Sequence, residues 1–187
     1  MAITRFYIRK VAFRGAKTGN SPVDRSKLGT KRHILTDKNG IPLSVIISSA
    51  STHDINLVTD VVDSAVIKRK KSEGRGRTRR QHLCLDKGYH SVQEEQELIK
   101  RGYMLHIPIK KKKSKNTGKK EEEQQEEARV MPFRKKYSPK RWVVERTNSW
   151  HNRFRKLFTR YEKMDENYLG LVQFSCCMII YRKIILG

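Results

Sequence analysis

The prediction of the fold starts from residues 83–89, which read Leu83-Cys84-Leu85-Asp86-Lys87-Gly88-Tyr89. The stretch from His82 to Leu85 is short and largely apolar, which favours a buried central strand. Asp86 follows the strand directly, and Gly88 favours a turn after it. The segment therefore predicts a carboxylate held at the exit of a buried strand. The alternative is that Asp86 only initiates the turn.

A second informative segment, residues 141–146, reads Arg141-Trp142-Val143-Val144-Glu145-Arg146 and is predicted to be helical. At about 100° per residue, Glu145 lies on a polar side of that helix, shared with Arg141, Asn148, Ser149 and Asn152. The opposite side is predicted to face the core and carries Val143, Trp150, Phe154 and Leu157. The alternative is a solvated Glu145 that pairs with Arg141 one turn back.

Turn and cap signals divide the rest of the chain into strands and helices. Asn39-Gly40 predicts a hairpin between strands 32–36 and 41–49, because this turn needs positive φ. Helices are predicted over 55–67, with Asp54 as N-cap, and over 91–101, with Ser91 and Glu94 as a capping box. Further strands are predicted over 82–85 and 103–109. Pro139 begins a long helix, and a last apolar helix covers about 167–186.

The order of these elements indicates an α/β fold: hairpin, helix, strand, helix, strand, helix. Such an order builds a mixed sheet flanked by helices. It is the order of a ribonuclease-H-like fold, provided that one more strand lies at or before residue 8; residues 5–8 are a candidate. Residues 1–187 are expected to form one domain, interrupted at 110–136 by a charged low-complexity insertion and completed by the C-terminal apolar helix.

Composition points to a polyanionic partner. The 187 residues contain 42 Lys and Arg against 19 Asp and Glu, a formal net charge of +23. Nucleic acid is the commonest partner for such a surplus. The three cysteines, Cys84, Cys176 and Cys177, lie in apolar runs and form neither a disulfide framework nor a CxxC pair. A reducing compartment is therefore expected.

Targeting signals are not apparent in the sequence. The first residues lack the apolar core of a signal peptide, and the longest apolar stretch, residues 169–181, is too short to span a bilayer. The prediction is a protein without a membrane partner, cytoplasmic and associated with the nucleoid, or nuclear if the host is eukaryotic.

Two acids delivered by a strand end and a helix suit metal-dependent phosphodiester chemistry. Two divalent ions can activate the attacking oxygen and stabilise the leaving oxygen, and carboxylates from different elements must hold them. Mg²⁺ takes hard oxygen ligands and keeps several waters, so two or three carboxylates suffice. Asp86 and Glu145 are the candidate ligands, with Mg²⁺ or Mn²⁺ as the cofactor.

An ordered set of motifs gives a specific resemblance. The pieces are residues 15–19, 22–33, 40–43, 52–54, 86–89, 141–150, 153–157 and 160–162. As a set they resemble the catalytic domain of DDE transposases of bacterial insertion sequences, over about 15–182 apart from the charged insertion. The resemblance implies a ribonuclease-H-like fold and DNA strand cleavage and transfer.

The resemblance also implies residue roles. Asp86 would be the second catalytic acid and Glu145 the third, both as metal ligands. The residues expected to contact DNA are Arg141, Arg146, Arg153, Arg155, Lys156, Lys31 and Arg32. Some members of the family carry a lysine seven residues after the glutamate. Here that position is Asn152, so Arg153, Arg155 or Lys156 would have to substitute.

The first acid of the family is missing from its expected place. It should lie on the opening strand about ten residues before Gly15, where this chain has Thr4, Arg5 and Phe6. The sequence therefore resembles an N-terminally truncated transposase that is inactive on its own. The alternatives are a non-catalytic DNA-binding relic, which forms mixed complexes with intact copies or a homodimer, and a general basic nucleic-acid-binding protein.

Overall fold

The structure is a computed structural model that describes residues 2–3, 7–22, 25–67, 81–86, 91–107 and 142–186. The strands are β1 (Ala2–Ile3), β2 (Tyr7–Lys10), β3 (Gly19–Asn20), β4 (Leu28–Thr36), β5 (Pro42–Ser49), β6 (Gln81–Cys84) and β7 (Tyr103–His106). The helices are η1 (Asp54–Leu57), α1 (Val58–Asp63), α2 (Val92–Lys100), α4 (Trp142–Asn152), α5 (Arg155–Phe158) and α6 (Asp165–Ile184). The insertion at 110–136 and the predicted helix start at Pro139 lie outside the described residues.

The strands form one mixed sheet in which β4 pairs with β1, β2, β3 and β5. β5 lies antiparallel along one edge of β4, and β2 and β1 follow one another antiparallel along the other edge. β1 then pairs in parallel with β6, and β6 pairs in parallel with β7. The extra strand required at or before residue 8 is therefore present as β1 and β2. The predicted mixed α/β architecture is confirmed.

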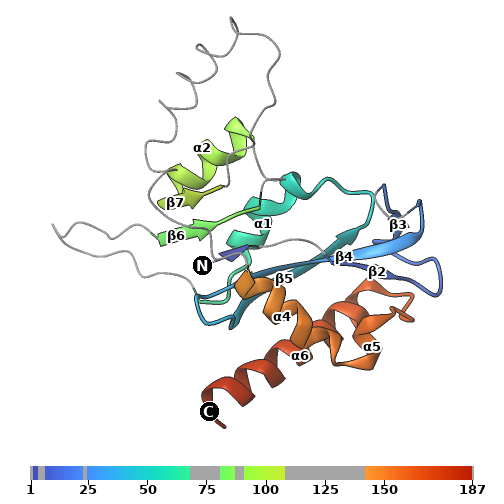
Figure 1. Cartoon of the computed structure of the whole chain (residues 1–187). Helices are drawn as coiled ribbons and strands as arrows, with labels where there is room; N and C mark the ends of the chain where they lie inside the picture. The colour runs from blue at the N-terminus through green and yellow to red at the C-terminus, as the bar shows by residue number, and fades with distance from the viewer. Residues whose placement is uncertain are drawn as a thin grey trace, which may run out of the picture.

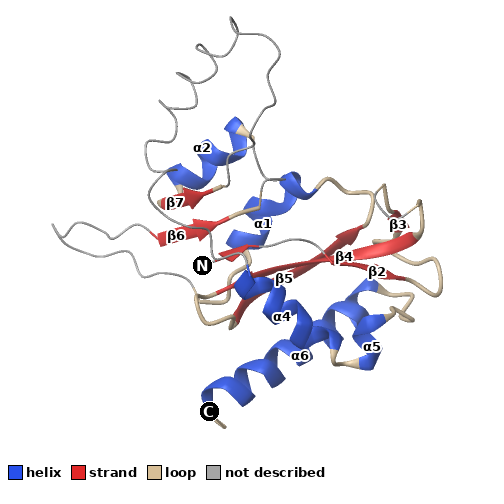
Figure 2. Cartoon of the chain, in the orientation of Figure 1, coloured by secondary structure: helices blue, strands red, loops and turns tan. Residues whose placement is uncertain are grey.

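Helices cover both faces of this sheet (Figures 1 and 2). α1 and α2 lie on one face, and α4, α5 and α6 lie on the other. Since both faces of β4 are covered, its residues from Gly29 to Thr36 are all buried, and the strand shows no alternation of polar and apolar positions. The first strand of the hairpin was predicted over 32–36, but β4 already begins at Leu28, and the short strand β3 precedes it.

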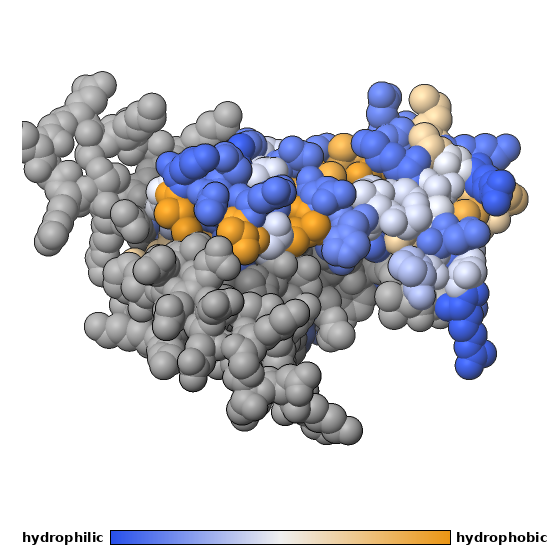
Figure 3. Space-filling model, turned by 90° about the horizontal axis from the view of Figure 1, so that it is seen from above, coloured by the Kyte–Doolittle hydropathy of each residue, from blue (hydrophilic) through white to orange (hydrophobic). Residues whose placement is uncertain are grey.

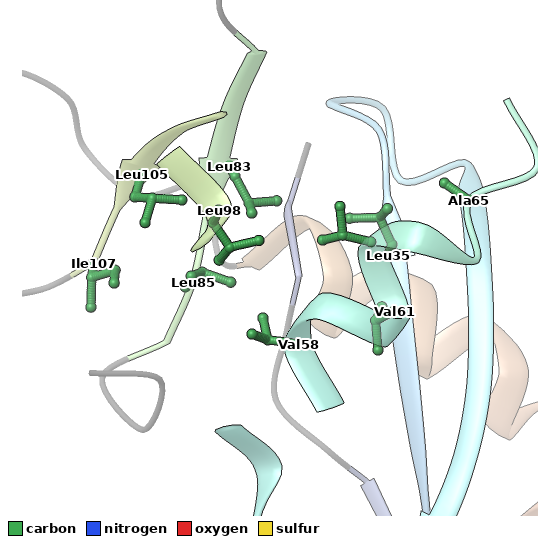
Figure 4. Packing of buried hydrophobic residues seen from close by; sticks show 10 residues of the cluster. Leu35, Val58, Val61, Ala65, Leu83, Leu85, Leu98, Leu105 and Ile107 are labelled. Carbon is green, nitrogen blue, oxygen red and sulfur yellow. The ribbon is translucent and has the colours of Figure 1, made fainter. Parts of the chain in front are cut away.

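The core is divided between the two faces. On the α1 and α2 face, Leu83, Leu85 and Leu105 of the parallel strands meet Leu98 of α2, with Val58 and Val61 of α1 beside them (Figure 4). On the other face, Ile47 of β5 packs against α5 and α6, and Ile34 of β4 packs against Val144 of α4. Neighbouring residues Ile34 and Leu35 thus contribute to opposite layers, as the alternation of a strand requires.

The β4–β5 hairpin confirms the predicted Asn-Gly turn. Gly40 has φ +86°, and the Asp37 carboxylate accepts hydrogen bonds from the backbone N–H of Asn39 and Ile41, both at 2.8 Å. The turn is also fixed to α4, since Thr147 Oγ1 donates to the carbonyl of Gly40 at 2.7 Å and Arg146 donates to the carbonyl of Asn39 at 2.6 Å. The hairpin therefore sets the position of the helix that carries Glu145.

Of the two predicted helix caps, Asp54 is wrong, and Ser91 is confirmed in position but without its capping hydrogen bond. Asp54 begins the short 3-10 helix η1, and its carboxylate accepts from Lys31 instead of capping a helix. Ser91 occupies the N-cap position of α2, but its side chain makes no capping hydrogen bond. The predicted helix over 55–67 is also shorter, because regular α-helix is limited to α1.

Arg160 joins segments that are remote in sequence. Its side chain is fully buried and donates to Thr30 Oγ1 at 2.8 Å and to the carbonyls of Glu162 and Lys163, and its guanidinium lies 5.3 Å from the Tyr168 ring centre. Its backbone also bonds to Lys10 and Ala12, next to the end of β2. Arg160 thus connects the strands β2 and β4 with the segment that leads into α6.

Arg160→Ala is expected to lower the free energy of unfolding by about 3 kcal/mol, because buried acceptors lose a charged donor and a cavity remains. Urea unfolding followed by circular dichroism measures the change. The exposed Arg153→Ala variant is the control and should change stability by less than about 0.5 kcal/mol. An equal effect of the two substitutions would contradict the role given to Arg160.

None of the described helices is both long and apolar enough to cross a membrane. Seen from above, hydrophilic side chains cover most of the described surface, and hydrophobic residues show between them (Figure 3). Large apolar side chains are also exposed on α6, among them Phe174 and Tyr181.

Candidate active site

Asp86 follows the buried strand β6 as predicted. The backbone N–H of Leu85 bonds to the carbonyl of His106 at 3.0 Å, so pairing with β7 continues to the residue before Asp86. Leu83 and Leu85 belong to the core under α1 and α2, whereas Cys84 packs against the cluster of Ile34 and Val144. Asp86 is two residues after Cys84, so in an extended backbone its side chain is expected on the same face of the sheet, which is the face that α4 covers. Its side chain is half-buried.

Glu145 lies in the first turn of α4, next to the fully buried Val144. Val144 contacts the same cluster that Cys84 joins from β6. Val144 and Cys84 therefore belong to one packed cluster. Glu145 follows Val144 directly, and Asp86 is two residues after Cys84. Glu145 is half-buried. Each acid thus lies close in sequence to a residue of one packed cluster.

The end of β1 reaches the same region. Ala2 pairs with Cys84 in parallel and with Thr36 of β4 in antiparallel, so β1 lies between β4 and β6. The C-terminal ends of parallel neighbours lie at one edge of a sheet. Position 4, two residues after Ala2, corresponds in sequence count to Asp86, two residues after Cys84. Residues 4–6, where the resemblance expects the first acid, lie outside the described residues.

The two carboxylates are the candidate donors of a metal site. Their oxygen atoms suit Mg²⁺ or Mn²⁺. Among the described residues, however, no three His, Cys, Asp or Glu side chains are grouped so that they could hold a metal ion. The chemistry of the donors therefore fits a divalent cation, and the number of donors is incomplete.

The predicted DNA-contacting residues differ in exposure. Arg153, Arg155 and Lys156 are exposed around the junction of α4 and α5. Arg146 lies between two indoles instead, with its guanidinium 4.8 Å from the Trp142 ring centre and 5.1 Å from that of Trp150. Arg141 lies outside the described residues.

Lys31 and Arg32 are buried, which argues against the predicted direct contact with DNA. Lys31 Nζ donates to Asp54 Oδ1 and to the Thr52 carbonyl, each at 2.7 Å. Burial nevertheless raises the pKa of Asp54, and the Lys31 ammonium opposes that shift. Arg32 is 0% exposed and donates to Asn152 Oδ1 at 2.9 Å.

Asn152 occupies the position at which some transposases carry a lysine, and two buried arginines bind it. Arg9 of β2 donates to the same Oδ1 atom as Arg32. The sequence prediction proposed Arg153, Arg155 or Lys156 as substitutes for that lysine and did not consider Arg9. The strands β2 and β4 thus each place one guanidinium group against the Asn152 side chain. No signal in the sequence distinguishes Arg9 from the many other basic residues.

The polar strip predicted for α4 also needs correction. Asn148, assigned to the solvent side together with Glu145, is 1% exposed, whereas Trp150, assigned to the core side, is only half-buried. The prediction assumed one continuous helix, but α4 ends at Asn152 and α5 begins at Arg155. The buried face therefore centres on Val144, Thr147 and His151.

A buried row of polar side chains lies between α4 and α6 and consists of His151, Ser175 and Cys176. His151 Nδ1 lies 2.6 Å from Ser175 Oγ, and its Nε2 lies 3.8 Å from Cys176 Sγ. Burial, with Arg32 and Arg9 nearby, lowers the pKa of His151 to about 3, and burial raises the pKa of Cys176 to about 12. Both groups are neutral near pH 7, and all three side chains are buried.

His151 and the buried His33 predict acid sensitivity, since burial lowers the pKa of His33 to about 3 as well. Each is neutral when folded and binds a proton on unfolding between about pH 6.5 and pH 3. The unfolded state therefore binds more protons. As the pH is lowered from about 6.5 to 3, the free energy of unfolding should decrease by about 1.4 kcal/mol per pH unit for each of the two histidines. Urea unfolding from pH 7 to pH 4 should show a shallower slope in His151→Gln. The exposed His53→Gln control should keep the full slope.

Comparison with known proteins identifies the family. A family model described as a transposase DDE domain matches residues 8–180. The chain is also 30% identical, over 177 residues, to a Burkholderia cepacia protein whose name assigns it as a transposase of insertion sequence element IS402. That match covers 95% of this chain and 74% of the relative. No solved structure matches the chain significantly. The protein is a member of the DDE transposase family of insertion sequences.

Proposed function

We propose that this chain is a transposase catalytic domain that binds DNA and holds two of the three acids needed to cut it. The arrangement of β1, β6 and α4 is the observation that carries the proposal. Ala2, Cys84 and Val144 mark where the three elements meet, and Asp86 and Glu145 lie next to that point. The family to which the chain belongs supports DNA as the substrate.

A ribonuclease-H-like fold is part of this proposal. β5, β1, β6 and β7 run in one direction and β4 runs against them, with β4 between β5 and β1. Helices on both faces complete the arrangement. The order of strands supports the fold expected from the sequence.

Asp86 and Glu145 are the proposed metal ligands. When bound, Mg²⁺ or Mn²⁺ would activate an attacking oxygen and stabilise a leaving oxygen. Asp86 would provide a rigid ligand from a strand end, and Glu145 a ligand oriented by the contacts of α4 with the hairpin turn. Since no three potential ligands are grouped among the described residues, we propose that the chain does not cleave DNA on its own.

DNA binding is proposed to rest on the charge of the chain. The net charge is +23, and Arg153, Arg155 and Lys156 expose their cations close to α4. Such contacts displace counterions from DNA, so affinity falls steeply with salt. We also propose a location at the cytoplasmic nucleoid, because the substrate lies there.

A non-catalytic role is the second candidate, and the missing acid favours it. In that role the chain would hold DNA and associate with another copy of itself or with an intact transposase. A general basic nucleic-acid-binding protein is the weaker alternative, because the family match covers nearly the whole chain.

Nicking and binding assays test the proposal together. With Mg²⁺ or Mn²⁺, the chain should bind duplex DNA in low salt and leave supercoiled plasmid intact. Nicking that disappears in Asp86→Ala would overturn the proposed inactivity. Lack of DNA binding in low salt would overturn the proposed function as a whole.

A further inference from the structure

A cavity of about 360 Å³ lies between α4 and α6, apart from the two acids. Its apolar walls are Trp150, Phe154, Met178 and Ile179. Arg153, Arg182 and Lys183 complete the lining, which includes no acidic residue. Its size falls in the range of small-ligand sites.

This lining suits a ligand that is both aromatic and anionic. Apolar walls bind a planar ring, and an indole offers a face on which a nucleobase can stack. Three cations beside the ring favour phosphate. An apolar peptide segment would satisfy the walls but leave the cations without a partner in the ligand.

Lys183 lies where such a ligand would enter. Its ammonium is 5.0 Å from the Trp150 ring centre, and Lys183 also lines a neighbouring cavity bordered by Trp142 and Arg146. A ring that stacks on Trp150 would displace this ammonium. Because Lys183 is exposed and has a flexible stem, it can then contact a phosphate of the same ligand.

The cavity is distinct from the site of the two acids. Trp150 follows Glu145 by five residues on α4, which places it about 140° further round the helix. The cavity can therefore hold a part of the DNA that is not reacting. A base inside a duplex is stacked and paired, so only an unpaired nucleotide can enter.

We propose that the α4–α6 cavity captures an unpaired nucleotide of DNA, with its base on Trp150 and its phosphates on Arg153, Arg182 and Lys183. The inference rests on the proposed function, because it takes DNA as the substrate. It adds a second contact that prefers a frayed or single-stranded end to a blunt duplex.

Fluorescence of Trp150 tests this directly, since the chain has two tryptophans. In Trp142→Phe, Trp150 is the remaining indole. Three DNA probes share one duplex: a blunt form, a form with a three-nucleotide single-stranded extension, and the extended form with abasic sites in the extension. Only the extension with bases should quench Trp150, and it should bind about tenfold tighter than the blunt form, as one stacked base allows.

The double variant Arg182→Gln/Lys183→Gln should lose this tenfold preference while keeping affinity for the blunt duplex within about twofold. Both residues are exposed, and the double variant Lys100→Gln/Arg101→Gln, which removes an exposed lysine and arginine at the end of α2 that do not line the cavity, is the matched control. Equal binding of blunt and extended DNA would overturn the cavity proposal and leave the proposed function standing. Equal quenching by the abasic probe would overturn base recognition. No binding of any probe would overturn the proposed function itself.

Discussion

Thr4→Asp is expected to nick DNA in the presence of Mn²⁺ or Mg²⁺, whereas the natural chain is expected not to. Ala2 is level with Cys84 in parallel strands, and Asp86 is two residues beyond Cys84. Position 4 is as far beyond Ala2 in the sequence as Asp86 is beyond Cys84, and the prediction is that an aspartate there supplies the third carboxylate. Completing the metal site should lower the barrier by several kcal/mol, a gain on the order of 10³-fold in nicking rate.

Two further variants separate this gain from a general effect on the fold. Thr4→Asn has a similar shape without the charge and should stay inactive. Thr4→Asp combined with Asp86→Asn should lose the gained activity. Calorimetric titration with Mn²⁺ should give tighter binding in Thr4→Asp than in either control. A folded Thr4→Asp protein that gains neither metal affinity nor nicking would show that β1, β6 and α4 do not form the metal site.

Gly40→Ala should destabilise the protein far more than Gly102→Ala, although both glycines have nearly the same positive φ, +86° and +87°. A Cβ at Gly102 meets nothing within 4 Å, so its cost is the left-handed conformation alone, about 1 kcal/mol. A Cβ at Gly40 would lie 2.9 Å from Thr147 Oγ1 and 3.1 Å from Arg146 Nη2. It should therefore also disturb both hydrogen bonds between the turn and α4, for a total of about 3 kcal/mol.

Urea unfolding of the two alanine variants provides the comparison, with circular dichroism as the signal. Thr147→Val removes the hydrogen bond to Gly40 without adding atoms in the turn and should fall between the two. If Gly40→Ala and Gly102→Ala lower the free energy of unfolding equally, α4 can shift to accommodate the added Cβ at no cost. In that case the hairpin would not determine where Glu145 lies.

Local signals in the sequence were sufficient where one short segment decides the structure. The Asn39-Gly40 turn and the strand before Asp86 depend on backbone preferences and a few neighbouring residues, and both are confirmed. The cap predicted at Asp54 was wrong for the opposite reason. The Asp54 carboxylate had a distant competitor, Lys31, which the sequence did not reveal as a neighbour.

Burial of charge was the least predictable property. Lys31 and Arg32 stand in a basic motif and look like surface cations, yet pairing on both sides of β4 encloses them. The same effect hid Arg9, whose partner Asn152 is 143 residues away. Side chains of this kind are recognised only when the strands that enclose them are known. The resemblance proposed Asp86 and Glu145 as site residues, but it gave no indication of the α4–α6 cavity.

The position of Arg160 has a consequence for synthesis of the chain. Arg160 bonds to Thr30 of β4 and to the end of β2, and it follows Thr30 by 130 residues. Both strands therefore leave the ribosome long before Arg160 does. Long-range closure of this kind slows folding and exposes unpaired strand edges in the meantime. A nascent chain stalled before residue 160 should therefore depend on chaperones, and a shortened gene product that ends there should accumulate as aggregates.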